Sequence, residues 1–408
     1  MYGSGKDIRR NLALFFLDGV VFTPAMTLIS ITSVIPYFLT QLGATTFQVG
    51  LAASLALICN FISQPVFGRI ASHSIMMHRT FGKILLLQRI IFMLFVLCIP
   101  VFAGFGRLMV WAFLFFWGVF NIFVGSYNVF YTPLVLKLLP PDKRGALRGM
   151  GNAAGSLLGV GAAALIPILL DRAAFPGNYT LIFSIGSVLL LIDGALFLIM
   201  RMPADAEPNT PMGMLQYIRE MPAAVRGNAP FRAMVLTCMF LVAANSLLAY
   251  YTLYAIRVFS ATESQVGILA ALAVIAGAVG YVVFGIAVDR RGPQFTTVIS
   301  AALVVISGAL ALTTHSLSLL YVAWALANLA SSCYMVSAAL LLGKVSPSSK
   351  LPLYVGVYAV ISLSLSSAML LLLAPALERV GFIPLFAAVL LCGAFSLLSN
   401  IFILKRRL

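Results

Sequence analysis

The chain has 408 residues, of which 62% are hydrophobic and only 9% charged, and its mean hydropathy is +1.06. A soluble domain carries about a quarter charged residues, so this composition excludes a water-soluble enzyme of this length; a disordered chain would need low hydrophobicity and high charge. The net charge of +15 raises nucleic acid as a partner. That interpretation fails if the positive residues lie in short loops between apolar spans.

Twelve hydrophobic runs follow one another along the chain, each long enough to cross a bilayer as a helix. Every backbone N–H and C=O in hydrocarbon needs an internal partner, so runs of this length predict helices, and the period-two pattern of a membrane β-barrel is absent. The sequence therefore predicts an all-α integral membrane protein. The expected spans are 11–39, 47–69, 82–104, 108–136, 149–170, 179–201, 231–258, 264–287, 294–314, 317–343, 353–377 and 382–404.

The Lys and Arg residues sort to one side of this arrangement. With alternating connections, 21 of the 26 lie on the side of the two termini and four on the other side, and Arg89 is left inside the third span. This asymmetry predicts cytoplasmic termini and a multi-pass protein of the plasma membrane. The first apolar run is too long for a cleavable signal peptide and has no small-residue cleavage site after it.

The polar, proline-rich stretch 202–230 predicts a cytoplasmic linker between an N-terminal bundle, 1–201, and a C-terminal bundle, 231–408. The two halves repeat each other. A shift of 217 places Gln48 on Gln265 and Gly68 on Gly285, and a shift of 207 places Trp117 on Trp324 and Asn121 on Asn328. Fixed offsets over this length indicate two copies of one six-span unit.

Two parallel six-span repeats are typical of secondary transporters whose substrate binds near the membrane midplane. On these features the sequence resembles the major facilitator superfamily over essentially the whole chain. The family's loop signature, Gly-x-x-x-Asp-Arg-x-Gly-Arg-Arg, matches at Gly285, Asp289, Arg290 and Gly292. The resemblance implies two six-helix bundles related by pseudo-two-fold symmetry, with this loop latching helices together at the cytoplasmic face; an ordinary solvated loop is the alternative.

The first copy of this signature departs from the family's pattern. Gly68 is present, but Ser72 and His73 occupy the Asp and Arg positions, so a latch in the first half is in doubt. Gly151, Gly155 and Gly159 in the fifth span have the spacing of close helix packing, which we favour over an exporter motif.

The resemblance implies that spans one, four, seven and ten line the substrate cavity. Amide and hydroxyl groups in hydrocarbon need a partner or water, and several at one depth suggest a shared polar cavity. For each residue, a hydrogen bond between neighbouring helices is the alternative. The candidates are Asn60, Gln64, Asn121, Tyr127, Asn128, Asn245, Tyr250, Asn328 and Tyr334.

Three ionisable residues lie well inside spans: Asp18, Arg89 and Asp193. At 1.5 Å per residue, each lies roughly 10 Å inside the cytoplasmic boundary. Two acids and one Arg leave one carboxylate without a charge partner, so that it can titrate. We interpret the set as a proton-coupling site with Asp18 as the titrating member, and a structural buried ion pair is the alternative.

The sequence thus predicts a secondary active transporter that moves a small molecule by alternating access, coupled to protons. A transporter-like membrane sensor and a lipid or drug exporter of the same fold are the alternatives. An enzyme is not expected, because no clustered acid, base or nucleophile lies within the spans, and no nucleotide-binding loop is present. We expect no cofactor or metal, no nucleic acid, and a monomer whose partners are the substrate, protons and membrane lipids.

Overall fold

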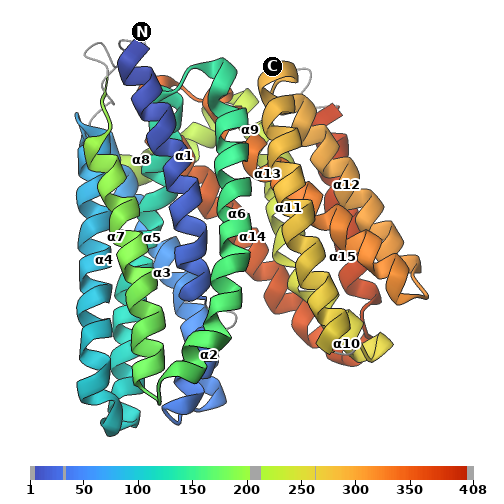
Figure 1. Cartoon of the computed structure of the whole chain (residues 1–408). Helices are drawn as coiled ribbons and strands as arrows, with labels where there is room; N and C mark the ends of the chain where they lie inside the picture. The colour runs from blue at the N-terminus through green and yellow to red at the C-terminus, as the bar shows by residue number, and fades with distance from the viewer. Residues whose placement is uncertain (1–4, 31–33, 203–212, 262, 402–408) are drawn as a thin grey trace. The chain divides into compact units, whose positions relative to one another are not determined.

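The computed structural model of the chain describes residues 5–30, 34–202, 213–261 and 263–401, and nearly all of these are helical (Figure 1). The helices form two compact units, Met1–Leu139 with Ala154–Met214 and Pro140–Ala153 with Leu215–Leu408. The first unit contains α1 (Gly5–Leu28), α2 (Val34–Gln41), α3 (Thr46–His73), α4 (Met77–Phe102), η1 (Ala103–Phe105), α5 (Arg107–Leu138), most of α6 (Arg144–Arg172) and α7 (Gly177–Ile199).

The second unit contains the short helix η2 (Pro141–Lys143) and the first residues of α6. Its other elements are α8 (Met214–Gly227), α9 (Ala229–Ser246), α10 (Ala249–Phe259), α11 (Glu263–Arg291), α12 (Pro293–Thr313), α13 (Leu317–Val345), η3 (Ser348–Lys350), α14 (Leu351–Val380) and α15 (Ile383–Ser399).

Eleven of the described helices are long and apolar enough to cross a membrane, and α15 is a shorter apolar helix. Large apolar side chains such as Leu97, Phe115 and Leu157 are exposed on these helices, as expected where a helix faces lipid rather than water. The prediction of an all-α membrane protein with twelve spans is confirmed in its class and in the order of its spans.

Two predicted spans are not continuous helices. The first is divided between α1 and α2, and the seventh between α9 and α10, so the predictions of unbroken helices over 11–39 and 231–258 were wrong. In the seventh span, Leu247 N–H bonds Ala244 O and Leu248 N–H bonds Asn245 O, which tightens the backbone into a turn. A hydropathy profile does not detect such breaks, because a turn that is buried in protein can consist of apolar residues.

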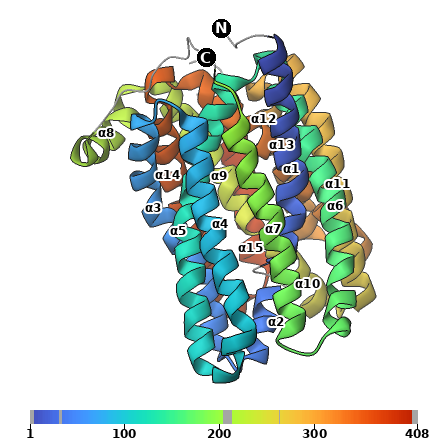
Figure 2. The ribbon, with the colours of Figure 1, turned by 60° about the vertical axis from the view of Figure 1, so that its left-hand side comes forward.

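The repeat predicted from sequence is visible in how the helices pack. In the first unit α3 packs on α5, α4 on α5 and α7, and α1 on α7. In the second unit the corresponding pairs are α11 on α13, α12 on α13 and α15, and α9 on α15. Figures 1 and 2 both show α4 and α7 lying side by side in the first unit.

Hydrogen bonds repeat in the same register. The indole of Trp117 donates to Ala52 O at 3.0 Å, and the indole of Trp324 donates to Leu269 O at 2.7 Å. Ala52 and Leu269 are related by the shift of 217, and the two tryptophans by the shift of 207. Each Trp therefore ties its helix to the same backbone position of the neighbouring helix, which satisfies an N–H that would otherwise be costly to bury.

One close helix contact is built in opposite ways in the two units. On α5, a Cβ added to Gly125 would lie 1.9 Å from Ser63 Oγ of α3. In the second unit the serine is on the other helix: Ser332 of α13 packs on Gly280 of α11, where an added Cβ would lie 2.8 Å from the Ser332 Cβ. The two shifts relate these positions, so each interface has room for one serine and needs glycine opposite it.

The predicted linker includes the helix α8, and its residues 203–212 lie outside the described residues. Tyr217 Oη donates to Pro352 O at 3.3 Å, and Lys350 Nζ lies 2.7 Å from Glu220 Oε2. The hydrogen bond from Lys350 holds the pKa of Glu220 below its usual value. These contacts attach α8 to the start of α14. By their contacts, residues 140–153 belong to the second unit. The predicted division into 1–201, 202–230 and 231–408 remains a prediction.

The serine–glycine exchange predicts a selective rescue. Gly125→Ser should destabilise the protein by about 1–3 kcal/mol, because the new side chain has no space against Ser63. Adding Ser63→Gly recreates the arrangement of Gly280 and Ser332 and should restore part of the lost Tm, since the added Cβ would still lie 2.8 Å from Asn60 O. Gly161→Ala is the matched control, since an added Cβ there meets nothing within 4 Å. Equal Tm values for the single and double variants would contradict the exchange.

Candidate functional site

The three ionisable residues predicted to lie at one depth meet in the first unit. Asp18 of α1, Arg89 of α4 and Asp193 of α7 are 1%, 2% and 0% exposed. A guanidinium N–H of Arg89 donates to Asp193 Oδ2. Because α7 packs on both α1 and α4, it brings the two carboxylates and the single cation into one buried cluster.

Asp18 has neighbours other than Arg89. Its carboxyl group lies near the side chains of Asp193 and Tyr131, and Tyr127 Oη donates to Asp18 Oδ1 at 3.5 Å. The cluster contains two carboxyl groups and one guanidinium. The cluster therefore has a net charge of zero with one proton bound and −1 without it.

Aromatic rings and one glycine give the cluster its shape. Phe15 and Phe197 pack against each other and against Tyr131, with ring centroids 5.7–6.3 Å apart. A Cβ added to Gly194 would lie 2.8 Å from Arg89 Nη1, so the residue after Asp193 must be small for the guanidinium to fit. Arg89 Nε and Nη1 and Asp193 Oδ1 have no hydrogen-bond partner among the described residues.

The other candidates of the first unit have mixed surroundings. Gln64 Nε2 donates to Asn60 Oδ1 at 2.9 Å within α3, and Gln64 Oε1 is buried without a partner among the described residues. Asn121 donates to Trp117 O of its own helix at 2.8 Å, whereas Asn128 is exposed. Tyr127 stacks on Tyr131, with ring centroids 4.8 Å apart. Tyr127 is therefore the cavity candidate that lies beside the charged cluster.

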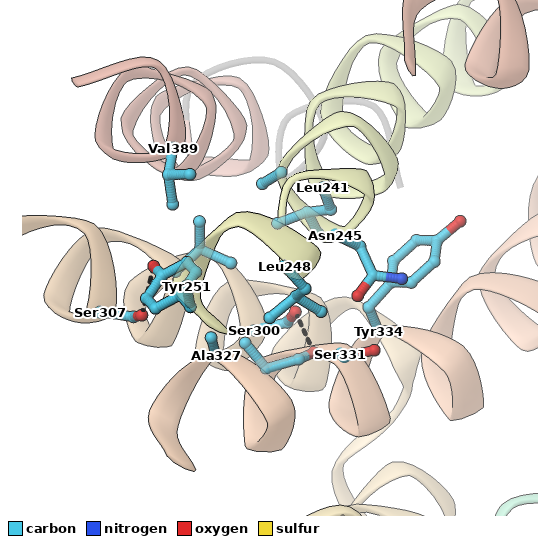
Figure 3. A pocket seen from close by; sticks show the side chains of 13 residues that line it. Leu241, Asn245, Leu248, Tyr251, Ser300, Ser307, Ala327, Ser331, Tyr334 and Val389 are labelled. Atoms are coloured by element: carbon cyan, nitrogen blue, oxygen red, sulfur yellow. Dashed lines mark hydrogen bonds between the residues drawn. The ribbon is translucent and has the colours of Figure 1, made fainter. Parts of the chain in front are cut away.

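In the second unit, Asn245 and Tyr334 line a small cavity (Figure 3). It has a volume of about 20 Å³, enough for one water molecule. Asn245 Oδ1 is buried next to the break between α9 and α10 and has no partner among the described residues. Figure 3 shows the Asn245 amide beside the Tyr334 ring. The cavity is lined by apolar, hydroxyl and amide groups and by no charged side chain.

The remaining two candidates do not line this cavity. Asn328 donates to Trp324 O of its own helix at 2.9 Å, which repeats the bond of Asn121, and Tyr250 is half-buried. The nine predicted cavity residues thus divide, five in the first unit and four in the second. That they face one substrate remains a prediction.

The sequence reasoning missed several hydroxyl groups at this cavity. Tyr358 of α14 is hydrogen bonded to Tyr334, Ser300 and Ser307 of α12 line the cavity, and Tyr251 bonds Ser307 at 2.9 Å. Ser300 donates to Ala330 O at 2.8 Å. Serines inside an otherwise apolar span were the available signal, but a serine that bonds a backbone carbonyl is common in such helices.

The loop signature of the second half has a defined partner. Asp289, at the end of α11, accepts from the backbone N–H groups of Gly145 and Ala146, at 2.8 and 2.7 Å. These groups begin α6, where unsatisfied N–H groups and the helix dipole favour a negative charge. An added Cβ at Gly285 would lie 2.6 Å from Gly145 O, so glycine at this position lets the two backbones come close together.

The other signature residues lie beside this contact. Gly292 has φ +82°, a conformation that favours glycine, and its N–H donates to Val288 O to end α11. Arg290 is exposed. In the first half, Ser72 Oγ instead donates to Arg69 O at 2.7 Å, and no carboxylate stands in its place.

The fifth-span glycines make a similar approach in the first unit. A Cβ added to Gly155 would lie 2.0 Å from Gly19 O of α1, and one added to Gly159 would lie 3.2 Å from Thr27 Oγ1. Close packing therefore accounts for these two glycines.

The comparisons with known proteins give a family match to part of the sequence and a fold match to the whole chain. Residues 233–407 match the sequence model of the Major Facilitator Superfamily. The whole fold agrees with solved transporters of that superfamily. The family is thus matched in sequence over the C-terminal part of the chain, and the whole chain has the fold of these transporters. The chain is accordingly a multi-pass membrane protein.

Three solved structures illustrate the fold that this chain shares. The E. coli fucose:proton symporter FucP is 16% identical, with a TM-score of 0.73 over 96% of this chain and 98% of that one. The proton:xylose symporter XylE is 15% identical, with a TM-score of 0.72 over 99% and 96%. The human organic anion transporter MFSD10 is 17% identical, with a TM-score of 0.72 over 97% and 99%. A search of curated protein sequences returns no match.

The buried pair gives a prediction about stability. Asp193→Asn should lower folded yield and destabilise the protein by about 3–5 kcal/mol, because it leaves the Arg89 charge buried without its carboxylate. Asp7→Asn is the matched control: Asp7 pairs at 3.2 Å with Arg201, whose side chain is 62% exposed, and such surface pairs contribute little. Thermal unfolding of both variants in detergent makes the comparison. A normal Tm for Asp193→Asn would show that the pair does not hold the bundle together.

Proposed function

We propose that this protein is a member of the superfamily and a secondary active transporter that moves a small neutral molecule by alternating access and couples this movement to protons. The observation that carries the proposal is the buried cluster of Asp18, Asp193 and Arg89. It holds one carboxylate more than its cation can neutralise. Proton-driven transport requires a group whose protonation changes as access alternates, and this surplus carboxylate is such a group.

Asp18 is the member that titrates in this proposal. Arg89 is engaged by Asp193 through a direct ion pair, whereas Asp18 contacts Asp193 and the two tyrosine hydroxyls. A proton can therefore enter or leave Asp18 while the ion pair stays intact. Tyr127, a candidate cavity residue, lies next to Asp18, so the proton site and part of the proposed substrate site are in contact.

The chemistry of the second unit supports a neutral substrate. Its cavity offers amide and hydroxyl groups, which exchange hydrogen bonds with uncharged polar groups, and no charged side chain lines it. In this structure the cavity has room for one water molecule, and the buried Asn245 Oδ1 has no partner among the described residues, so it is an acceptor for a hydroxyl or amide group. A charged substrate would need a countercharge at such a buried site.

The remaining assignments belong to the same proposal. The basic loops and both termini face the cytoplasm, and the protein lies in the plasma membrane. Asp289 acts as the cytoplasmic latch, with Gly285, Arg290 and Gly292 shaping its loop. Its carboxylate holds the start of α6 through two charge-assisted hydrogen bonds, which are about twice as strong as neutral ones.

A test of coupling begins with a thermal-shift screen of neutral small molecules on the purified protein, including L-fucose and D-xylose, the sugars named for two of the structural relatives. Asp18→Asn fixes the cluster at zero net charge, as in the protonated form. We expect this variant to bind the screened substrate and exchange it in counterflow, yet to lose accumulation driven by a proton gradient in proteoliposomes.

The controls separate this role from a structural one. Asp18→Asn leaves Arg89 with its partner, so its folded yield should stay near that of the wild type, unlike Asp193→Asn. Normal gradient-driven accumulation by Asp18→Asn would eliminate this residue as the coupling site. Substrate binding without any flux in the wild-type protein would instead indicate a sensor.

The latch gives a second transport prediction. Asp289→Asn removes the charge that α6 binds, and losing one charge-assisted hydrogen bond costs about 1.5 kcal/mol or more, so the initial rate should fall about tenfold. Folded yield should stay normal. Asp142→Asn, an exposed acid of η2, is the control and should transport normally. Equal rates for the two variants would leave Asp289 as an ordinary loop residue.

A further inference from the structure

A basic pocket lies where α3 ends and α4 begins, in the first unit. It is lined by Arg69, Ile70, His73, Ser74, Ile75 and Thr80, is open to the surface and has a volume of about 460 Å³. No acidic side chain lines it, and the chain contains no Asp or Glu between Asp18 and Asp142. Arg69 and His73 are both exposed, so the pocket presents a positive face without a carboxylate to neutralise it.

The corresponding loop of the second unit contains its own anion. Ser72 and Asp289 are related by the shift of 217, and Asp289 accepts from two backbone N–H groups. Ser72 instead bonds Arg69 O, and His73 Nδ1 lies 3.0 Å from the same oxygen. The first loop thus has a cationic pocket and a serine at the position of the acid, so a negative charge there would have to come from outside the chain.

The surface leading to the pocket indicates the source of that anion. On α3 the exposed residues Ile62, Val66, Arg69 and His73 follow one face of the helix, which therefore passes from apolar to basic as it approaches the pocket. Between the two helices, Ile75 is 83% exposed. A free aqueous ion would gain nothing from this apolar stripe, whereas a lipid has acyl chains to cover it.

The neighbouring helix has the same pattern in the opposite chain direction. On α4, Arg79 and Lys83 are exposed near the pocket, and Leu87 and Ile90 are exposed farther along. Both helices are candidate membrane spans, so their basic ends lie where the hydrocarbon gives way to head groups.

We propose that this pocket binds the phosphate of an anionic phospholipid, with Arg69 and His73 at the head group and the acyl chains along Ile62 and Val66. The lipid belongs to the leaflet on the side of the basic loops. The bound head group places a negative charge beside the loop in which Ser72 stands where the other loop has Asp289.

The test uses the purified full-length protein in detergent, titrated with phosphatidylglycerol and followed by native mass spectrometry and Tm. Arg69→Gln should weaken phosphatidylglycerol binding about fivefold, the effect of about 1 kcal/mol for one basic residue at a lipid surface. Adding His73→Gln should weaken it further. Ser72→Asp, which supplies the missing acid, should also reduce binding. Arg10→Gln removes an exposed charge outside the pocket and should leave binding unchanged.

Two further arms identify the source of the phosphate. Inorganic phosphate at equal concentration, and phosphatidylcholine in place of phosphatidylglycerol, should give less stabilisation than phosphatidylglycerol. Ile75→Ser should weaken lipid binding, because it removes an apolar contact. The proposal is overturned if Arg69→Gln with His73→Gln binds phosphatidylglycerol as the wild type does. It is also overturned if inorganic phosphate or phosphatidylcholine stabilises the protein equally well.

Discussion

A polar group inside an apolar helical bundle has to find its partner within the protein, because lipid offers none. Several hydrogen bonds between helices of this chain follow from this constraint. The indoles of Trp117 and Trp324 donate to carbonyl groups of neighbouring helices, and Ser300 donates to Ala330 O. Each such bond fixes the rotation of one helix against the next. The packing of the bundles is therefore set as much by where these partners lie as by the apolar side chains around them.

The same constraint applies most strongly to the buried charges, because an unpaired charge costs more free energy to bury than a neutral polar group. Arg89 can remain in the bundle because Asp193 pairs with it and Gly194 leaves space for the guanidinium. Asp18 is not needed for this neutralisation. A second buried carboxylate is unfavourable for stability unless it binds a proton. A group that is unfavourable to the fold and changes charge with one proton is what proton coupling requires, and in our proposal Asp18 is that group.

The two units use one frame with different chemistry. Helix pairing and the Trp and Asn hydrogen bonds repeat in register, whereas Ser63 and Gly125 exchange roles with Gly280 and Ser332. The ionisable cluster lies only in the first unit, among the described residues, and the uncharged polar cavity lies in the second. The acid of the loop signature is present in the second unit and replaced by Ser72 in the first. The shared helix packing is thus compatible with different residues in the two units, provided that the contacts between helices are kept.

The sequence by itself determined the membrane class, the order of twelve spans, the register of the repeat and the common depth of Asp18, Arg89 and Asp193. Hydropathy, fixed offsets and the helical rise are local properties, so they can be read along one chain. Only the tertiary structure showed that Asn121 and Asn328 bond their own helices, that spans one and seven are broken, and that Tyr358 bonds Tyr334. The contact between Asp289 and the start of α6 was also visible only in the tertiary structure. These features depend on how each helix is rotated against its neighbours, and that rotation is set by small residues and hydrogen-bond partners distant in sequence.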